Sequence, residues 1–225
     1  MTSSTERGWA TALANWGGWL TWVLALSAFW FVATLAGAVV LGVAPASVAA
    51  ATLVRERSLG RHDRVWRDGF RHWARALVQS QAAFLPLAAA TAILGTDYLW
   101  FSAMGPAAAP ARLSTLIAFA LTVIALAWAA PLAAHYEVRP WRVTVFATRM
   151  LLARPASSAL LALVGGAIVY AAARIPFIAL FAPGVWFTAT TLLCLRFFAD
   201  NDARQAEGPD EAPRLPLPHE PLRTH

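Results

Sequence analysis

The chain has 225 residues and a net charge of +6, and 59% of its residues are hydrophobic against 13% that are charged. Together with a mean hydropathy of +0.55, this composition is typical of an integral membrane protein and excludes an ordinary water-soluble domain. All 18 basic residues are arginine, so chemistries that need a lysine, such as a standard Walker A phosphate loop or Schiff-base catalysis, are excluded.

A first transmembrane helix is predicted from Trp19 to Val40. The run is long enough to cross the ~30 Å hydrocarbon core, and it is too long for the apolar part of a secretory signal peptide. Trp16, Trp19 and Trp22 gather at its start. Because amphipathic indole rings favour the headgroup level, these tryptophans are expected at a membrane surface.

The stretch Leu35 to Arg57 joins this span to a second, shorter helix, with a corner predicted at Gly42 to Pro45. Glycine gives the corner backbone freedom, and proline suits the first turn of a new helix. Only about ten apolar residues precede Arg55, at ~1.5 Å each, so the short helix cannot cross the core unaided and is expected to be sheltered by protein.

A small residue recurs at every fourth position through this corner, which predicts a close approach of neighbouring backbones; the residues are Ala38, Gly42, Ala46 and Ala50. Two interpretations remain open. The corner is either a tight hairpin between two spans or a half-helix facing a substrate path, as in transporters with broken helices. Whether the short helix, residues 45–57, crosses the membrane or re-enters it is equally open.

The next stretch is the most charged part of the chain. Aromatic and aliphatic residues recur there at helical spacing on one face, at Trp66, Phe70, Trp73 and Leu77, and arginines recur on another, at Arg64, Arg67, Arg71 and Arg75. The pattern predicts a basic amphipathic helix in the membrane interface, with its aromatics in acyl chains or a partner and its guanidinium groups on lipid phosphates. An ordinary positive cytoplasmic loop would show similar residues, so both interpretations stand.

Further spans follow along the chain. A loop from Gly95 to Ala111, rich in Ala, Pro and Gly and with Asp97 and Tyr98 near its start, separates the second full span from the third. A second arginine-rich loop covers residues 137–156. The single cysteine, Cys194, lies in the last apolar run and is read as a core residue. The predicted spans after the first are Ala76–Leu94, Leu113–Ala134, Ser157–Ala173 and Phe177–Leu195.

These elements predict an all-α membrane bundle of about five full spans and one short broken helix, with basic amphipathic cytoplasmic helices. Residues 1–198 form the single transmembrane domain, and residues 199–225 are expected to be a disordered polar tail. Eleven of the 18 arginines fall in the loops 55–75 and 137–156. Because cytoplasmic loops collect positive charge, these loops and both chain termini are predicted to be cytoplasmic.

The order of several motifs resembles the YesL-like family of bacterial membrane proteins of unknown function. The similar stretches cover about residues 10 to 198 and are LGVAPASVAAATLVRE (Leu41 to Glu56), WRDGFRHWARAL (Trp66 to Leu77), GTDYLWF (Gly95 to Phe101), PLAAHYEVRPWRVTVFATRMLLARP (Pro131 to Pro155) and IPFIALFAPG (Ile175 to Gly184). The resemblance implies a bacterial inner-membrane protein, often encoded beside carbohydrate ABC transporters. It implies no activity.

No pattern in the chain points to an enzyme. Ionisable side chains that could transfer protons lie near the predicted cytoplasmic surface, at His62, Asp63, His72, His135 and Glu137. No HExxH or GxSxG motif occurs, and no span carries paired carboxylates. Asp97 beside Tyr98 is the one candidate for a polar site on the other side. We therefore expect a protein without catalysis, cofactor or bound metal.

Two functional classes remain. The first is an accessory membrane protein whose basic helices bind anionic lipids or subunits of an ABC transporter, with no nucleic-acid partner. The second is a small-molecule channel or carrier built around the broken helix at Gly42 to Pro45. The first is favoured, because a coupled transporter normally carries a buried acid within a span and the predicted spans have none at their middle.

Overall fold

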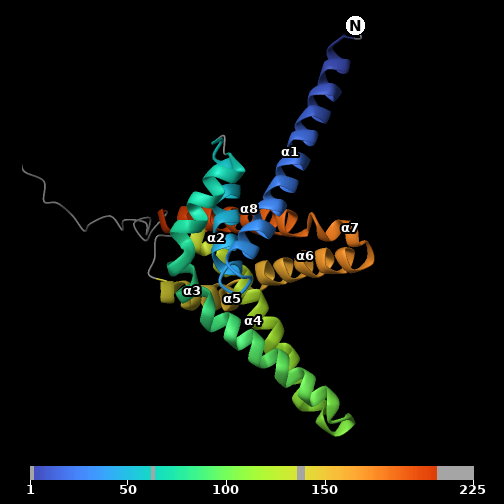
Figure 1. The fold of residues 1–225 in the computed structure, drawn as a ribbon, viewed down its shortest axis with the longest axis vertical. Coiled ribbons are helices and arrows are strands. Elements are labelled where there is room, and N and C mark those ends of the chain that lie inside the picture. Colours follow the sequence, from blue (N-terminus) through green and yellow to red (C-terminus); the bar gives the residue numbers. More distant parts are fainter. Residues whose placement is uncertain (1–2, 62–63, 136–139, 207–225) are drawn as a thin grey trace, which may run out of the picture.

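The computed structural model describes residues 3–61, 64–135 and 140–206, and every regular element in these ranges is helical (Figure 1). The predicted all-α fold is confirmed. In chain order the elements are α1 (Ser3–Ala36), α2 (Val43–Ser58), α3 (Val65–Ala103), the short 3-10 helix η1 (Pro106–Ala108), α4 (Ala109–His135), α5 (Pro140–Ala153), α6 (Pro155–Arg174), α7 (Pro176–Ala179) and α8 (Ala182–Ala206).

Four segments among the described residues are long and apolar enough to cross a membrane, where the sequence predicted five; they are Trp16–Ala36, Val65–Ala103, Pro106–His135 and Pro155–Arg174. The predicted fifth span, Phe177–Leu195, is divided between α7 and α8. From Ala182 to Leu195, α8 offers an apolar length of about 21 Å before Arg196. That is short of the ~30 Å hydrocarbon core. The helix itself continues to Ala206, past the predicted start of the tail, and residues 207–225 lie outside the described part.

The basic amphipathic helix and the second predicted span are one continuous helix, α3, of 39 residues. The sequence analysis named them as two elements, an amphipathic helix up to Leu77 and a span from Ala76 to Leu94, because one part is rich in arginine and the other is apolar. The expected loop from Gly95 to Ala111 is also mostly helical, since α3 runs to Ala103 and α4 starts at Ala109. Pro86 lies inside α3, where a proline removes a backbone hydrogen bond and bends a helix, and α3 changes direction along its length (Figure 1).

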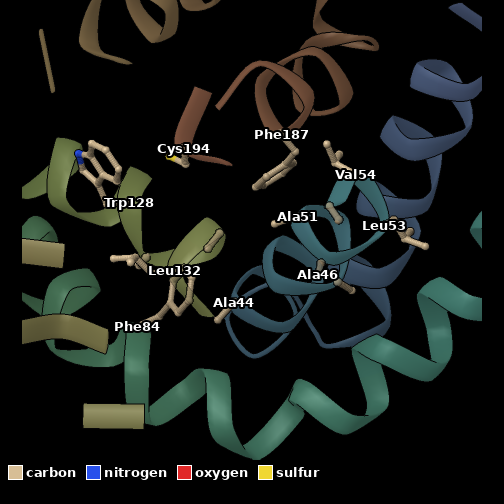
Figure 2. Packing of buried hydrophobic residues seen from close by; sticks show 14 of the residues in the cluster. Ala44, Ala46, Ala51, Leu53, Val54, Phe84, Trp128, Leu132, Phe187 and Cys194 are labelled. Carbon is tan, nitrogen blue, oxygen red and sulfur yellow. The ribbon is translucent and has the colours of Figure 1, made fainter. Parts of the chain in front are cut away.

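The short helix α2 lies at the centre of the molecule, in contact with α1, α3, α4 and α8. Nine of its 16 residues are buried, among them Ala46, Ala50 and Leu53. In Figure 2, Ala44 of α2 lies towards Phe84 of α3, and Ala51 lies towards Phe187 of α8. The prediction that protein shelters this helix is confirmed. Alanine suits the position because four neighbouring helices can approach its backbone closely.

The corner between α1 and α2 lies earlier than the sequence predicted. The turn occupies residues 37–42, α2 begins at Val43, and Pro45 is the third residue of its first turn. The chain turns at Ala38 and Val39, whose φ angles are 52° and 65°. Positive φ angles are uncommon for residues other than glycine. Gly42 presses so closely on the Thr34 carbonyl that any side chain there would collide with it. Of the small-residue stripe, Gly42, Ala46 and Ala50 are buried whereas Ala38 is exposed.

Two long projections extend from this centre in different directions (Figure 1). The second half of α3 pairs with α4, and α6 returns through α7 into α8, while the start of α1 points away from both. A buried hydroxyl joins α8 to α1: Ser27 Oγ donates to the Phe181 carbonyl (3.1 Å) and accepts from the Gly184 N–H (2.9 Å). Large apolar side chains are exposed along the projections, as is typical of surfaces that face lipid; examples are Leu85, Ile93, Leu113, Leu163 and Val169.

Candidate functional site

The first half of α3 begins where the amphipathic pattern predicted. Arg64 is the N-cap residue, and its backbone N–H donates to the Asp68 carboxylate at 3.0 Å. An acid in the first turns also suits the positive end of the helix dipole. Asp68 therefore fixes the start of the helix and, through it, the register of the arginines that follow.

The aromatic face of this segment packs inside the protein. Phe29 of α1 is fully buried, and its ring lies 5.5 Å from Phe70 and 6.4 Å from Trp66 between centroids. Gly69 is buried directly against the Phe29 ring. The prediction that this face enters acyl chains or binds a partner is therefore wrong for Phe70 and, in part, for Trp73, which packs beside it. Trp66 remains 46% exposed.

The arginine face of the same segment points away from the protein. Arg64, Arg67, Arg71 and Arg75 are all exposed. Arg71 lies 3.9 Å from Asp68, a contact too exposed to neutralise the face strongly. Because the opposite face is held by Phe29, the arginines are presented to the outside on a helix that cannot rotate freely. This basic surface is the candidate functional site.

An ion pair that the sequence did not predict lies beside the basic surface. Glu56, near the end of α2, contacts His72 of α3 at 3.1 Å between Oε2 and Nε2, and both side chains are about one-fifth exposed. Arg61 approaches the other carboxylate oxygen at 4.0 Å. Glu56 and His72 are 16 positions apart in the sequence, so only the packing of α2 on α3 brings them together.

Arg57, near the end of α2, contacts the tryptophans where the apolar part of α1 begins. Its guanidinium carbon lies 5.0 Å from the Trp19 ring centre and 4.6 Å from that of Trp22, which is the geometry of cation–π contacts. The end of α2 is thus level with the predicted tryptophan belt. It follows that α1 and α2 run antiparallel, with Trp19 and Arg57 at one end and the corner at the other.

A second basic amphipathic helix, α5, packs against α3. Val143 and Ala147 are buried on its inner face, while Arg142 and Arg149 are exposed. Thr144 fixes the contact by donating its hydroxyl to the Ala83 carbonyl of α3 at 2.8 Å. The expectation of more than one basic amphipathic helix is confirmed. The cytoplasmic location of these helices stays a prediction.

The other predicted site residues lie within helices or at the corner, away from the basic surface. Asp97 and Tyr98 were expected in a loop; they lie inside α3, where Asp97 is exposed and the Tyr98 carbonyl accepts the Ser102 hydroxyl. At the corner, Gly42 and Pro45 are packing residues, both buried. Successive residues of a helix point about 100° apart, so Asp97 and Tyr98 face different directions.

Two of the five ionisable residues considered for proton transfer lie in the described part of the chain. His72 is held by Glu56, and His135 lies at the end of α4. His62, Asp63 and Glu137 lie outside the described residues. Within the part of the chain that the structure describes, no group of three or more His, Cys, Asp or Glu side chains could hold a metal ion.

Residues 23–98 match the model of a protein family of unknown function, DUF624. The matched stretch begins within α1 and ends near the end of α3, so it contains the corner, the central helix α2 and the whole basic surface. No curated protein and no solved structure matches the chain. The similarity is to a family without an assigned activity, and together with the four apolar helices it fits an integral membrane protein.

Proposed function

We propose that this chain is a non-enzymatic protein of the bacterial cytoplasmic membrane that uses the exposed arginines of α3 to bind an anionic surface on the cytoplasmic side. One observation carries the proposal: Arg64, Arg67, Arg71 and Arg75 are all exposed while the other face of their helix is fixed against Phe29. Arginine suits anionic headgroups because its guanidinium forms paired hydrogen bonds with phosphate oxygens.

The cytoplasmic placement rests on the arginine-rich segments, which the positive-inside rule assigns to that side. The resemblance to YesL-like proteins suggests the wider role, an accessory to a carbohydrate ABC transporter whose subunits would bind the same surface. The hypothesis of a channel or carrier around the corner has less support, because Gly42 and Pro45 are buried against their neighbours.

The test replaces all four arginines with glutamine, which removes the charge and keeps the helix propensity. Each arginine near an anionic surface contributes about 1 kcal/mol, so the enrichment of phosphatidylglycerol around the protein in native nanodiscs should fall to the bulk-membrane level. The wild-type enrichment should itself weaken as salt shortens the Debye length to well below ~10 Å.

A matched control carries Arg112→Gln and Arg174→Gln, which are exposed arginines at the ends of α4 and α6 away from the basic surface. It should keep the wild-type lipid composition. If the quadruple variant inserts in the correct orientation and still co-purifies with the same lipids and proteins as wild type, the proposal is wrong and the arginines serve only as topology signals.

A further inference from the structure

An apolar groove of about 800 Å³ lies between α4, α6 and α8. Along α4 its wall runs from Leu116 to Ala130, about 21 Å at ~1.5 Å per residue. The facing wall on α6 contains Gly166 and Val169. In Figure 1, α4 and α6 leave the central core in different directions. The volume of this groove is within the range of known ligand-binding pockets.

The residues that line the groove favour an apolar ligand. At the end of the groove near α2, the Trp30 indole N–H donates to the Ser47 hydroxyl at 3.3 Å, and that hydroxyl donates to the Val43 carbonyl at 2.7 Å. These polar groups are therefore satisfied within the protein. The remaining lining is aliphatic, aromatic, alanine or glycine.

We propose that the groove holds an acyl chain of a phospholipid with an anionic headgroup. Two of its three main walls, α4 and α6, are helices that are long and apolar enough to cross a membrane, so the groove lies at hydrocarbon depth. The rim is continuous with the lipid-exposed surface, since Leu116, Val123 and Val169 are 43%, 40% and 69% exposed. Acyl chains are the apolar groups available at that depth.

Charge at one end of the groove selects the headgroup. Arg55 reaches over the end of α4 and donates to the Ala134 carbonyl at 3.4 Å. Ala134 lies one helical turn beyond Ala130, on the same face of α4 that lines the groove. The α6 wall starts at this end too, because Trp128 of α4 donates to Ser158 at 3.3 Å, one turn after Arg154. A phosphate bound there would leave its acyl chain running into the groove.

Gly166 allows a direct test. A side chain at Gly166 would meet no atom within 4 Å, so Gly166→Phe should fill the groove without straining the fold. The matched control is Gly18→Phe, at a glycine of α1 that is equally open and lies outside the groove. The measurement is the number of phosphatidylglycerol molecules retained by the detergent-purified protein in native mass spectrometry. Wild type and Gly18→Phe should each retain one, and Gly166→Phe should bind about tenfold more weakly or worse.

A second variant and a headgroup comparison complete the test. Val123→Trp fills the groove from the α4 wall and should also release the lipid, with thermal melting used to verify folding. Arg55→Gln should weaken binding of phosphatidylglycerol towards the level of phosphatidylcholine, whereas Arg112→Gln, at the other end of α4, should not. Arg55 lies outside the four arginines of the basic surface, so this result is separable from the proposed function.

Three outcomes would overturn the inference. The acyl-chain site is excluded if Gly166→Phe and Val123→Trp fold and retain as much lipid as Gly18→Phe. If Gly166→Phe and Val123→Trp abolish a dimer instead of releasing a lipid, a second copy of the chain occupies the groove. Equal retention of phosphatidylglycerol and phosphatidylcholine by wild type would overturn the anionic headgroup.

Discussion

At the scale of single residues, Ser27 is the contact on which the position of α8 depends. Its side chain is fully buried and serves both the Phe181 carbonyl and the Gly184 N–H. Ser27→Ala leaves that N–H buried without its acceptor, which costs ~1–3 kcal/mol. We expect a clearly lower melting temperature in detergent, together with loosening of α8.

Ser102→Ala is the matched control for this prediction. The Ser102 hydroxyl is exposed and bonds only within its own helix, to the Tyr98 carbonyl. Its removal should change the melting temperature little, since exposed substitutions usually cost less than ~0.5 kcal/mol. Equal melting temperatures for the two variants would show that Ser27 does not hold the joint.

At the scale of the elements, the corner between α1 and α2 depends on the close approach of two backbones. Gly42→Leu places a side chain against the Thr34 carbonyl, so α1 and α2 must separate. Overpacking of this kind costs ~1–3 kcal/mol, and the thermal melt should shift accordingly. Gly166→Leu, where the added side chain meets open space, should leave the melt unchanged. An unshifted Gly42→Leu melt would mean that the corner is open to lipid.

The helical elements were largely predictable, because apolar runs and arginine spacing are local signals. The start of α3 at Arg64 and the protected position of α2 both followed from such patterns. The corner was predicted too late in the chain, because Gly42 and Pro45 are the residues whose types usually mark a turn. The turn is made instead by Ala38 and Val39, which rarely adopt positive φ angles. The continuity of α3 was missed because charged and apolar halves look like two helices when no packing is known.

At the scale of the whole molecule, the packing between distant segments could not be predicted. The aromatic face of α3 looked like a lipid or partner surface, and only the position of Phe29 shows that it is internal. The Glu56–His72 contact and the acyl-sized groove likewise require helices that are far apart in the sequence to meet. The arginines of α3, by contrast, were identified correctly as exposed, because an unpaired charge is rarely buried.

The basic surface can bind a cytoplasmic partner or lipid only if its end of the molecule faces the cytoplasm. The contact of Arg57 with Trp19 and Trp22 places the middle of α1, where its apolar part begins, level with the basic end of α2. This holds whether or not α2 reaches the far surface. The N-terminal end of α1 and the basic surface should therefore share the cytoplasmic side, and the turn between α3 and α4 should lie opposite.

Cysteine accessibility measures this directly, since the natural Cys194 is the only cysteine of the chain and is buried. In a Cys194→Ala background, single cysteines are placed at the exposed residues Trp16, Leu59 and Ala107. A membrane-impermeant thiol reagent added to intact cells should label the cysteine at 107 and leave those at 16 and 59 unlabelled until the cells are opened. Labelling of the cysteine at 59 in intact cells would contradict a cytoplasmic basic surface.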